Sequence, residues 1–189
     1  MIIGLTGTMG SGKGTISNHL RERGFNFITI SDLIRDELIK RGLPLKRREL
    51  QNLGNEMRRL NGNDYWAKQA IKKIDLKNDW VIDGIRNLGE IEELRNLPDF
   101  ILISVDAPEE IRLIRGQRRE RIIDGRISSD PKDLKEFKKL EARDRGLGEP
   151  DYGQQVLQCI EKADYGIIND NSIERLKKQI DSIIDNHRN

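Results

Sequence analysis

The feature that most constrains the fold of this chain is a glycine-rich segment, GTMGSGKGT, at residues 7–15. An apolar run at residues 2–5 precedes it and predicts a buried strand, and residues 16–21 follow it with the pattern of a helix. A glycine-rich turn in this context lets backbone N–H groups point at a phosphate, and the helix N-terminus adds its positive dipole end. Lys13 would add a mobile charge for the transferred phosphate. The predicted ATP-binding residues of this P-loop are Gly7, Thr8, Gly10, Ser11, Gly12, Lys13, Gly14 and Thr15.

The end of the P-loop departs from the usual pattern G-x-x-x-x-G-K-[ST]. Gly14 stands where a serine or threonine is expected, and Thr15 follows one residue later. The resulting Gly-Lys-Gly-Thr resembles the loop of adenylate kinase and related nucleoside monophosphate kinases. The resemblance implies ATP as the phosphoryl donor and Mg²⁺ as the cofactor. Without a hydroxyl at position 14, we expect magnesium to be held through water molecules and ATP oxygens.

The composition limits the class of protein. The 189 residues suit one domain, residues 1–189, with a hydrophobic core. The net charge of +2, from 34 basic and 32 acidic residues, argues against a general nucleic-acid-binding protein. No run has the apolar length of a membrane span, no signal peptide is recognisable, and Cys159 is the single cysteine. We therefore expect a cytoplasmic protein with no membrane partner, no intrachain disulfide and no cysteine-ligated zinc.

Apolar runs alternate with helical patterns along the chain. The predicted strands are residues 2–5, 25–30, 80–84, 100–105 and 165–169. The predicted helices are residues 12–23, 32–41, 46–60, 65–74, 91–97, 108–123, 130–145, 152–161 and 173–184, with Ser31 and Asp130 as caps. Continuous apolar strands separated by helices favour a parallel sheet covered on both faces. We therefore predict a three-layer α/β fold, the P-loop NTPase fold, with a five-stranded parallel sheet.

Ligands of such sheets bind beyond the carboxyl ends of the strands. Asp83 ends the third predicted strand, where a carboxylate could hold Mg²⁺ or its waters, although a strand-end acid can equally cap a turn. Arg86 follows three residues later, and a planar guanidinium suits a pair of phosphate oxygens. We therefore predict Asp83 as the metal residue and Arg86 as a catalytic and acceptor-binding residue.

Two segments at strand ends resemble the acceptor-phosphate segments of adenylate kinase. The segment SDLIR, which ends at Arg35, resembles the helix whose arginine holds the acceptor phosphate. The segment DGIR, which ends at Arg86, resembles the stretch before the second acceptor arginine, with a spacing one residue shorter and the usual proline missing. The resemblance implies that Ser31, Asp32, Arg35 and Arg86 bind the acceptor, and a surface helix residue is the alternative for each arginine.

The segment RELQNLGNEMR at residues 48–58 resembles the R-E-x-L-Q-x-x-G-x-E helix of phage-type deoxynucleoside monophosphate kinases, with tighter spacing here. In those kinases the helix packs over the acceptor nucleotide. The resemblance makes Gln51, Asn55 and Arg58 candidates for the acceptor pocket, and the alternative is a set of polar residues on a solvated helix face. An acceptor-binding region at about residues 31–75 is thereby implied.

An arginine-rich stretch follows the fourth predicted strand. Arg115 and Arg119 share a helix face, where like charges cost stability unless an anion lies between them. The stretch resembles the R-x-x-x-R lid helix of nucleotide kinases, whose arginines close over the triphosphate. Arg143 and Arg145 resemble the second arm of that lid. The resemblance implies a small lid at about residues 115–145 with Arg115 and Arg119 as catalytic residues, and pairing with surface acids is the alternative.

The last predicted strand and its turn, residues 165–172, resemble those of dephospho-CoA kinase and its relatives. The resemblance implies that Asn169 lies near the adenine of ATP, and it adds this residue to the ATP-binding set. An asparagine-rich turn that caps the last helix is a compatible alternative.

Nearly the whole chain therefore resembles the P-loop nucleoside and deoxynucleoside monophosphate kinases. The predicted activity is transfer of the γ-phosphoryl group of ATP to a small phosphorylated acceptor, chiefly such a monophosphate, with Lys13, Arg86, Arg115 and Arg119 as catalytic residues. No general base is needed when the acceptor is already a phosphate. The alternatives are a dephospho-CoA kinase, with Asp32 as the base, and an ATP-binding switch or partner protein without a small acceptor. The expected state is a monomer or homodimer.

Overall fold

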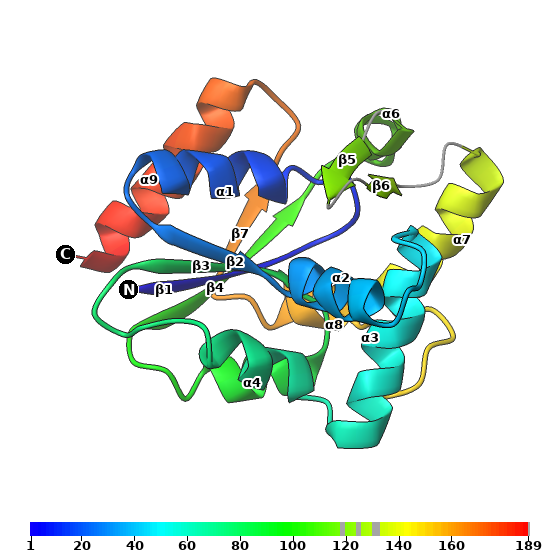
Figure 1. Cartoon of the computed structure of the whole chain (residues 1–189). Helices are drawn as coiled ribbons and strands as arrows, with labels where there is room; N and C mark the ends of the chain where they lie inside the picture. Colours follow the sequence, from blue (N-terminus) through cyan, green and yellow to red (C-terminus); the bar gives the residue numbers. More distant parts are fainter. Residues whose placement is uncertain (118–119, 124–125, 130–132, 189) are drawn as a thin grey trace.

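The structure is a computed structural model that describes residues 1–117, 120–123, 126–129 and 133–188. Its centre is a sheet of five parallel strands in the order β2-β3-β1-β4-β7 (Figure 1). These strands are β1 (Ile2–Thr6), β2 (Asn26–Thr29), β3 (Trp80–Ile85), β4 (Phe100–Asp106) and β7 (Tyr165–Ile168). The predicted five-stranded parallel sheet is confirmed. Because β1 lies in the middle, the P-loop leaves the sheet at its centre.

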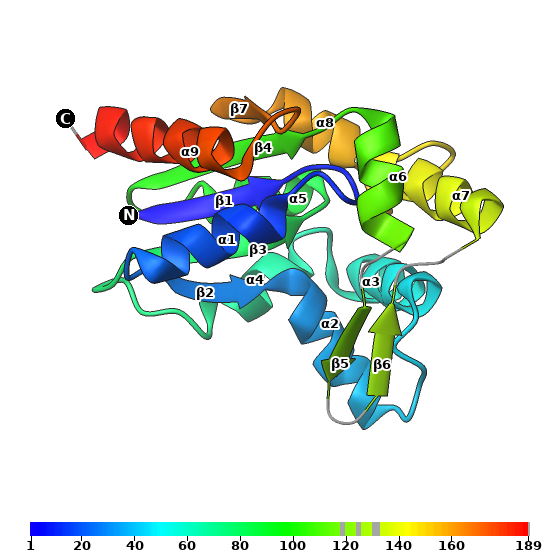
Figure 2. The same ribbon diagram turned by 90° about the horizontal axis from the view of Figure 1, so that it is seen from above.

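Helices cover both faces of the sheet and complete the three predicted layers. The described helices are α1 (Lys13–Glu22), α2 (Ile30–Lys40), α3 (Arg47–Asn61), α4 (Tyr65–Ile71), α5 (Leu88–Leu94), α6 (Glu109–Gln117), α7 (Leu134–Arg145), α8 (Val156–Glu161) and α9 (Ile173–Arg188). α1 and α9 lie on one face, and α4, α5 and α8 lie on the other. α2 begins at the carboxyl end of β2 and, with α3, extends beyond the sheet (Figure 2).

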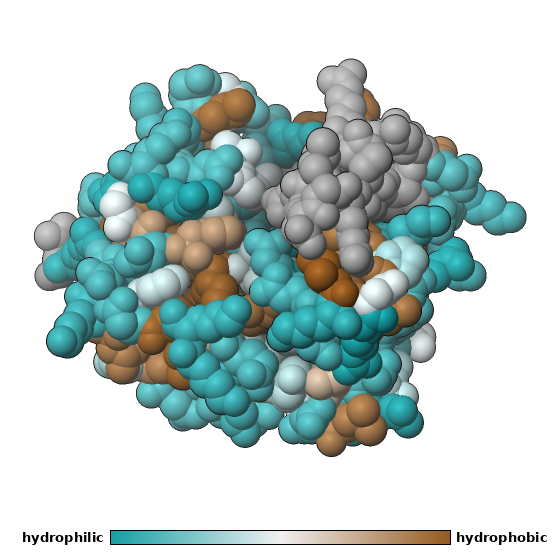
Figure 3. All heavy atoms as spheres, in the orientation of Figure 1, coloured by the Kyte–Doolittle hydropathy of each residue, from teal (hydrophilic) through white to brown (hydrophobic). Residues whose placement is uncertain are grey.

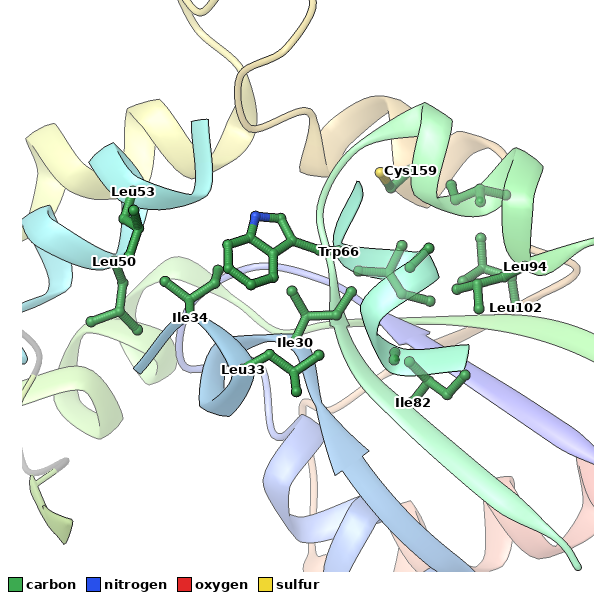
Figure 4. Close-up of a cluster of buried hydrophobic side chains, with 14 of the residues drawn as sticks. Ile30, Leu33, Ile34, Leu50, Leu53, Trp66, Ile82, Leu94, Leu102 and Cys159 are labelled. Atoms are coloured by element: carbon green, nitrogen blue, oxygen red, sulfur yellow. The ribbon is translucent and has the colours of Figure 1, made fainter. Parts of the chain in front are cut away.

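Two hydrophobic clusters form the core, one on each face of the sheet. Neighbouring strand residues point to opposite faces, so Ile2 and Ile3 of β1 enter different clusters. The cluster under α2 to α5 reaches Trp66, which lies among side chains of several elements (Figure 4). The Trp66 Nε1 donates to the Gly54 carbonyl at 3.2 Å. The region at residues 31–75 therefore shares its core with the sheet.

The predicted helix at residues 108–123 is wrong in its second half. α6 ends at Gln117, and β5 (Glu120–Ile123) pairs antiparallel with β6 (Arg126–Ser129). Isoleucines in both segments favour strands, and the Asp-Gly sequence between them is typical of a two-residue hairpin connection. The four-residue spacing of Arg115 and Arg119 favours a helix. The strand propensity of the isoleucines and the Asp-Gly sequence outweigh that helical pattern.

The N-caps of α2 and α7 are Thr29 and Asp133. Thr29, not Ser31, caps α2, because its Oγ1 accepts a hydrogen bond from the Ser31 N–H at 3.1 Å. Asp133 caps α7 by accepting a hydrogen bond from the Glu136 N–H at 2.8 Å. The predicted cap Asp130 lies outside the described residues. Ser31 therefore still lies at the carboxyl end of β2, where its backbone N–H donates to Thr29.

The surface reflects the high content of charged residues, 35% of the chain. The face in Figure 3 is largely hydrophilic, with hydrophobic side chains visible between the hydrophilic ones. Among the helices that the structure describes, none has the length and apolar character needed to cross a membrane.

Candidate active site

The P-loop has the geometry that close backbone approach requires. Gly7 has a φ of 141°, and a Cβ there would lie 1.9 Å from the backbone oxygen of Val105 on β4. Gly12 has a φ of 108°, and a Cβ there would lie 2.1 Å from Nδ2 of Asn169. Both positions therefore require glycine. Gly12 is also the N-cap of α1, and backbone N–H groups in the first turn of a helix can bind an anion.

Polar residues at the ends of β4 and β7 hold the P-loop in place. Thr8 Oγ1 donates to Asp106 Oδ1 at 2.6 Å. Asn169 Nδ2 donates to the Ser11 carbonyl at 2.8 Å, and its backbone N–H donates to the Asp106 carbonyl at 2.7 Å. The Asn169 side chain thus supports the loop, a role that the sequence resemblance did not imply.

Lys13 lies across the P-loop. Its Nζ donates to the carbonyl oxygens of Gly7 at 2.6 Å and Thr8 at 2.9 Å. A bound phosphate would offer charged oxygens to the same ammonium group, and charge-assisted hydrogen bonds are the stronger ones. Lys13 would therefore exchange loop carbonyls for phosphate oxygens when a nucleotide binds.

A cavity of about 730 Å³ adjoins the P-loop at the carboxyl ends of β2 and β3. Its lining residues are Met9, Gly10, Ser11, Gly12, Lys13, Gly14, Thr15, Ser17, Asn18, Arg21, Phe27, Thr29, Ser31, Asp32, Arg35, Arg47, Leu50, Asp83, Gly84, Arg86 and Arg115. Most of the predicted site residues are therefore gathered around one cavity, at the strand ends where parallel sheets bind ligands.

Asp83 is the carboxylate that the sequence predicts as the metal residue. It is 8% exposed, and its Oδ1 is buried with no hydrogen-bond partner in the described part of the chain. A buried acceptor without a partner costs free energy unless water or a ligand contacts it. Asp83 therefore fits Mg²⁺ or its water shell as one carboxylate ligand among ATP oxygens and waters. The described residues contain no cluster of three or more His, Cys, Asp or Glu that could hold a metal alone.

Three arginines from separate elements line the cavity, and we call this set, Arg35, Arg47 and Arg86, the acceptor floor. None of the three is more than 8% exposed. Arg35 on α2 forms an ion pair with Asp32 at 2.7 Å. Arg47 on α3 and Arg86 after β3 both pair with Asp144 of α7, and the Arg86–Asp144 distance is 2.7 Å. An anion that enters the cavity therefore meets guanidinium groups whose positions are already fixed.

Asp144 is completely buried between two of these guanidinium groups. Burial would raise the pKa of its carboxyl, but the charges of Arg47 and Arg86 and a hydrogen bond from Gln51 lower that pKa to about 2. Gln51 Nε2 donates to Asp144 Oδ1 at 2.7 Å and to the Leu140 carbonyl at 2.8 Å. Burial lowers the pKa of Arg86, and the neighbouring charge of Arg47 lowers it further. The network joins α3, α7 and the end of β3 through ionised side chains.

Three predicted acceptor residues on α3 do not line the cavity. Gln51 belongs to the network around the shared carboxylate. Asn55 Nδ2 donates to Glu149 Oε2 at 2.5 Å. Arg58 is 1% exposed and pairs with Glu90 at 2.8 Å. All three are buried, so the solvated-face alternative is wrong; their acceptor role stays a prediction, and we leave them out of the proposed acceptor site.

The predicted lid residues are only partly within the described structure. Arg115 on α6 lines the cavity, with Nη1 at 3.5 Å from the Gly10 carbonyl. Arg119 lies outside the described residues, so its role stays a prediction. Arg112 is buried and pairs with Glu141 of α7. Ion pairs therefore connect α7 to α6 as well as to the acceptor floor.

Sequence analysis did not single out Arg47 or Asp144. Arg47 stands between two other basic residues, and composition cannot tell which of the three faces the cavity. Asp144 stands between two arginines that resembled a lid arm. The sequence does carry a signal for the burial of Asp144. Phe137, Leu140 and Asp144 follow the i, i+3, i+7 spacing of one buried helix face.

The AAA domain family matches residues 3–134 of the chain. A UPF0200 protein of Sulfurisphaera tokodaii is 32% identical over 188 residues, which cover 97% of this chain and 95% of the relative. The chain belongs to the AAA domain family and to the UPF0200 family. This UPF0200 member spans nearly the full length of that relative.

Solved structures with the same fold include shikimate kinases. The one from Aquifex aeolicus vf5 has a TM-score of 0.59 and 18% identity, over 100% of this chain and 98% of its own. The one from Acinetobacter baumannii, in complex with shikimate, has a TM-score of 0.54 and 19% identity, over 97% of this chain and 92% of its own. The fold of this UPF0200 member is therefore that of the P-loop kinases, as the sequence resemblance implied.

Proposed function

We propose that this protein transfers the γ-phosphoryl group of ATP to a small phosphorylated acceptor, with nucleoside and deoxynucleoside monophosphates as the acceptor class. One observation carries the proposal: a single cavity joins the P-loop and Lys13 to the three arginines of the acceptor floor. ATP phosphates would bind at the start of α1, and the acceptor phosphate would bind the floor. Asp83 lines the same cavity.

The charge of the cavity suits two phosphorylated substrates. Six cationic side chains and two carboxylates line it. Like charges in a poorly hydrated site repel each other unless anions lie between them. The low pKa of Asp144, about 2, keeps that carboxylate ionised, so two floor arginines stay in place before the acceptor arrives. The floor therefore binds and orients the acceptor phosphate with little rearrangement.

The residues present fit phosphoryl transfer by alignment and charge neutralisation. An acceptor phosphate is itself the nucleophile, so no general base is required. Lys13 and Arg115 would neutralise charge on the transferred group, and the acceptor floor would hold the acceptor in line with it. Asp83 would hold Mg²⁺ or its waters, and the ion would supply further charge neutralisation on the ATP oxygens.

A second candidate reaction is phosphoryl transfer to a hydroxyl group, as in a dephospho-CoA kinase. The observation that favours it is Asp32, a carboxylate that lines the cavity with its side chain 47% exposed. It could accept a hydroxyl proton as general base. Its ion pair with Arg35 also suits a structural role, so the two acceptor classes are separated by experiment.

The test is ADP release from ATP and Mg²⁺ with a panel of nucleoside and deoxynucleoside monophosphates and dephospho-CoA. We expect turnover that depends on one or more monophosphates and falls at least about 100-fold in Lys13→Ala and Arg86→Ala. Arg59→Ala, on the exposed side of α3 and outside the cavity lining, is the matched control and keeps full turnover. Turnover with dephospho-CoA alone, lost in Asp32→Asn, would favour the hydroxyl acceptor. ATP binding without any acceptor effect would overturn both reactions and favour an ATP-binding switch.

A further inference from the structure

Part of the cavity is used by neither the P-loop nor the acceptor floor. Asn18 and Arg21 on α1 and Phe27 on β2 line it there. Asn18 and Arg21 are three residues apart on one helix face. Along the axis of α1, Arg21 lies about 12 Å beyond Lys13, at 1.5 Å per residue. This part of the cavity, which we call the arm, therefore runs along α1 from the P-loop toward the last turn of the helix.

Arg21 is arranged as an anion-binding group. Its guanidinium carbon lies 5.8 Å from the centroid of the Phe27 ring. A guanidinium stacked on an aromatic ring keeps its in-plane N–H donors available for an oxyanion. Within the described ranges Arg21 forms no ion pair, whereas Arg23 on the same helix pairs with Asp181. Arg21 is exposed at the edge of the cavity, and its contact there is with a ring and not with a carboxylate of the described residues.

The arm lies on the acceptor side of the cavity. β2, which carries Phe27, is one edge strand of the sheet, and β7, which leads to the P-loop support Asn169, is the opposite edge. Thr29 at the end of β2 and Asp32 at the start of α2 line the same cavity as Phe27. A molecule in this arm would therefore lie on the β2 side of the cavity, away from the β7 edge.

We infer that Arg21, Phe27 and Asn18 form a subsite for a second anionic group of the acceptor, a phosphate or carboxylate distant from the reacting phosphate. The inference rests on the proposed function and, among small phosphorylated acceptors, favours those with a second anionic end. Arg21 binds the second anion, Phe27 fixes the guanidinium plane, and Asn18 adds an amide donor. A plain nucleoside monophosphate leaves this subsite empty and binds more weakly.

The test compares binding of matched ligand pairs by calorimetry, with a non-hydrolysable ATP analogue and Mg²⁺ at saturation so that the P-loop is occupied. The pairs are adenosine 3′,5′-bisphosphate with AMP, and fructose 1,6-bisphosphate with fructose 6-phosphate. At least one bisphosphate should bind about tenfold more tightly than its monophosphate, the worth of one hydrogen-bonded ion contact. Arg21→Ala should abolish that gain, Arg21→Lys should keep part of it, and Arg59→Ala should leave it unchanged.

Two results would overturn the inference. One is equal affinity of both bisphosphates and their monophosphates, and the other is a gain that survives in Arg21→Ala. Because the readout is binding and not turnover, monophosphate-dependent ADP release could still stand when this inference fails. Loss of ADP release with every acceptor would instead remove the proposed function.

Discussion

The two ends of the cavity are built by different physical means. The P-loop is one continuous segment whose shape depends on glycine backbone angles, and it presents N–H groups and Lys13 to a phosphate. The acceptor floor takes its arginines from α2, α3 and the end of β3 and buries two of them against a carboxylate from α7. The first end relies on local conformation and the second on long-range ion pairing.

The difference has consequences for stability. Removing a P-loop side chain leaves the rest of the core in place. Removing one member of a buried ion network leaves the other charges desolvated, which costs more than the pair itself contributes. Removing a side chain of the acceptor floor should therefore lower the free energy of unfolding more than removing a side chain of the P-loop.

The largest expected effect on stability follows from replacing Asp144, the carboxylate that Arg47 and Arg86 share. Asp144→Ala leaves Arg47 and Arg86 buried without it and should lower the free energy of unfolding by about 3–5 kcal/mol. Glu136→Ala is the matched control on the same helix, because Glu136 pairs at 2.9 Å with Arg48 in an exposed position. That exposed pair should contribute less than about 1 kcal/mol. Urea unfolding at pH 7 measures both, and equal losses would remove the distinction between the two ends.

Acid should remove the contribution of Asp144 to the free energy of unfolding in a defined pH range. The pKa of Asp144 lies at about 2 in the folded protein, below the ordinary 3.8, so its stabilising contribution is fully present above pH 3.8 and is lost as pH falls through 2. The loss should amount to about 2 kcal/mol for this shift. The measurement is the stability difference between the wild-type protein and Asp144→Asn from pH 5 to pH 2. A difference that stays constant over that range would contradict the assignment.

Arg47 was found only in the structure, and its replacement separates acceptor binding from ATP binding. Arg47→Ala should raise the KM for the acceptor about tenfold, the effect of losing one charged hydrogen-bonding group, and leave the KM for ATP unchanged. The neighbouring Arg48→Ala, which removes an exposed arginine that does not line the cavity, is the control. Steady-state kinetics with each substrate varied in turn gives both constants. Equal rises in the KM for ATP and in the KM for the acceptor would mean that Arg47 has a structural role.

The smallest expected effect is at Gly14 of the P-loop. A Cβ at Gly14 would have no neighbour within 4 Å, and its φ is not positive. Gly14→Ala should therefore raise the free energy of unfolding by about 0.5 kcal/mol through helix propensity. Gly12→Ala should lower it, because its Cβ would collide with Asn169. Thermal unfolding of the two variants checks this, and equal shifts would mean that the loop backbone does not require glycine where we place it.

The sequence predicts the P-loop end of the site well. Its pattern is contiguous, and the flanking strand and helix follow from local apolar periodicity, so β1 and α1 lie where expected. The five strands are also predicted, because buried parallel strands are continuous apolar runs. The β5–β6 hairpin is not predicted, since arginine spacing and strand propensity conflict within one short segment.

The acceptor floor is only partly predicted, for a physical reason. Arg35 and Arg86 follow strand ends, and the parallel-sheet rule places both at the cavity. Arg47 and Asp144 meet only through the packing of α3 on α7, a contact with no local signature. Arg58 shows the converse, since its resemblance to an acceptor residue does not reveal its burial against Glu90.

The most direct test of the central claim follows the transferred phosphate itself. The protein would be incubated with Mg²⁺ and ATP radiolabelled in the γ-phosphate, together with each monophosphate or bisphosphate acceptor, and the products separated. We predict that the label appears on an acceptor and that Lys13→Ala abolishes this transfer. Label found only in inorganic phosphate, at a rate that no acceptor changes, would contradict the claim that one cavity holds donor and acceptor together.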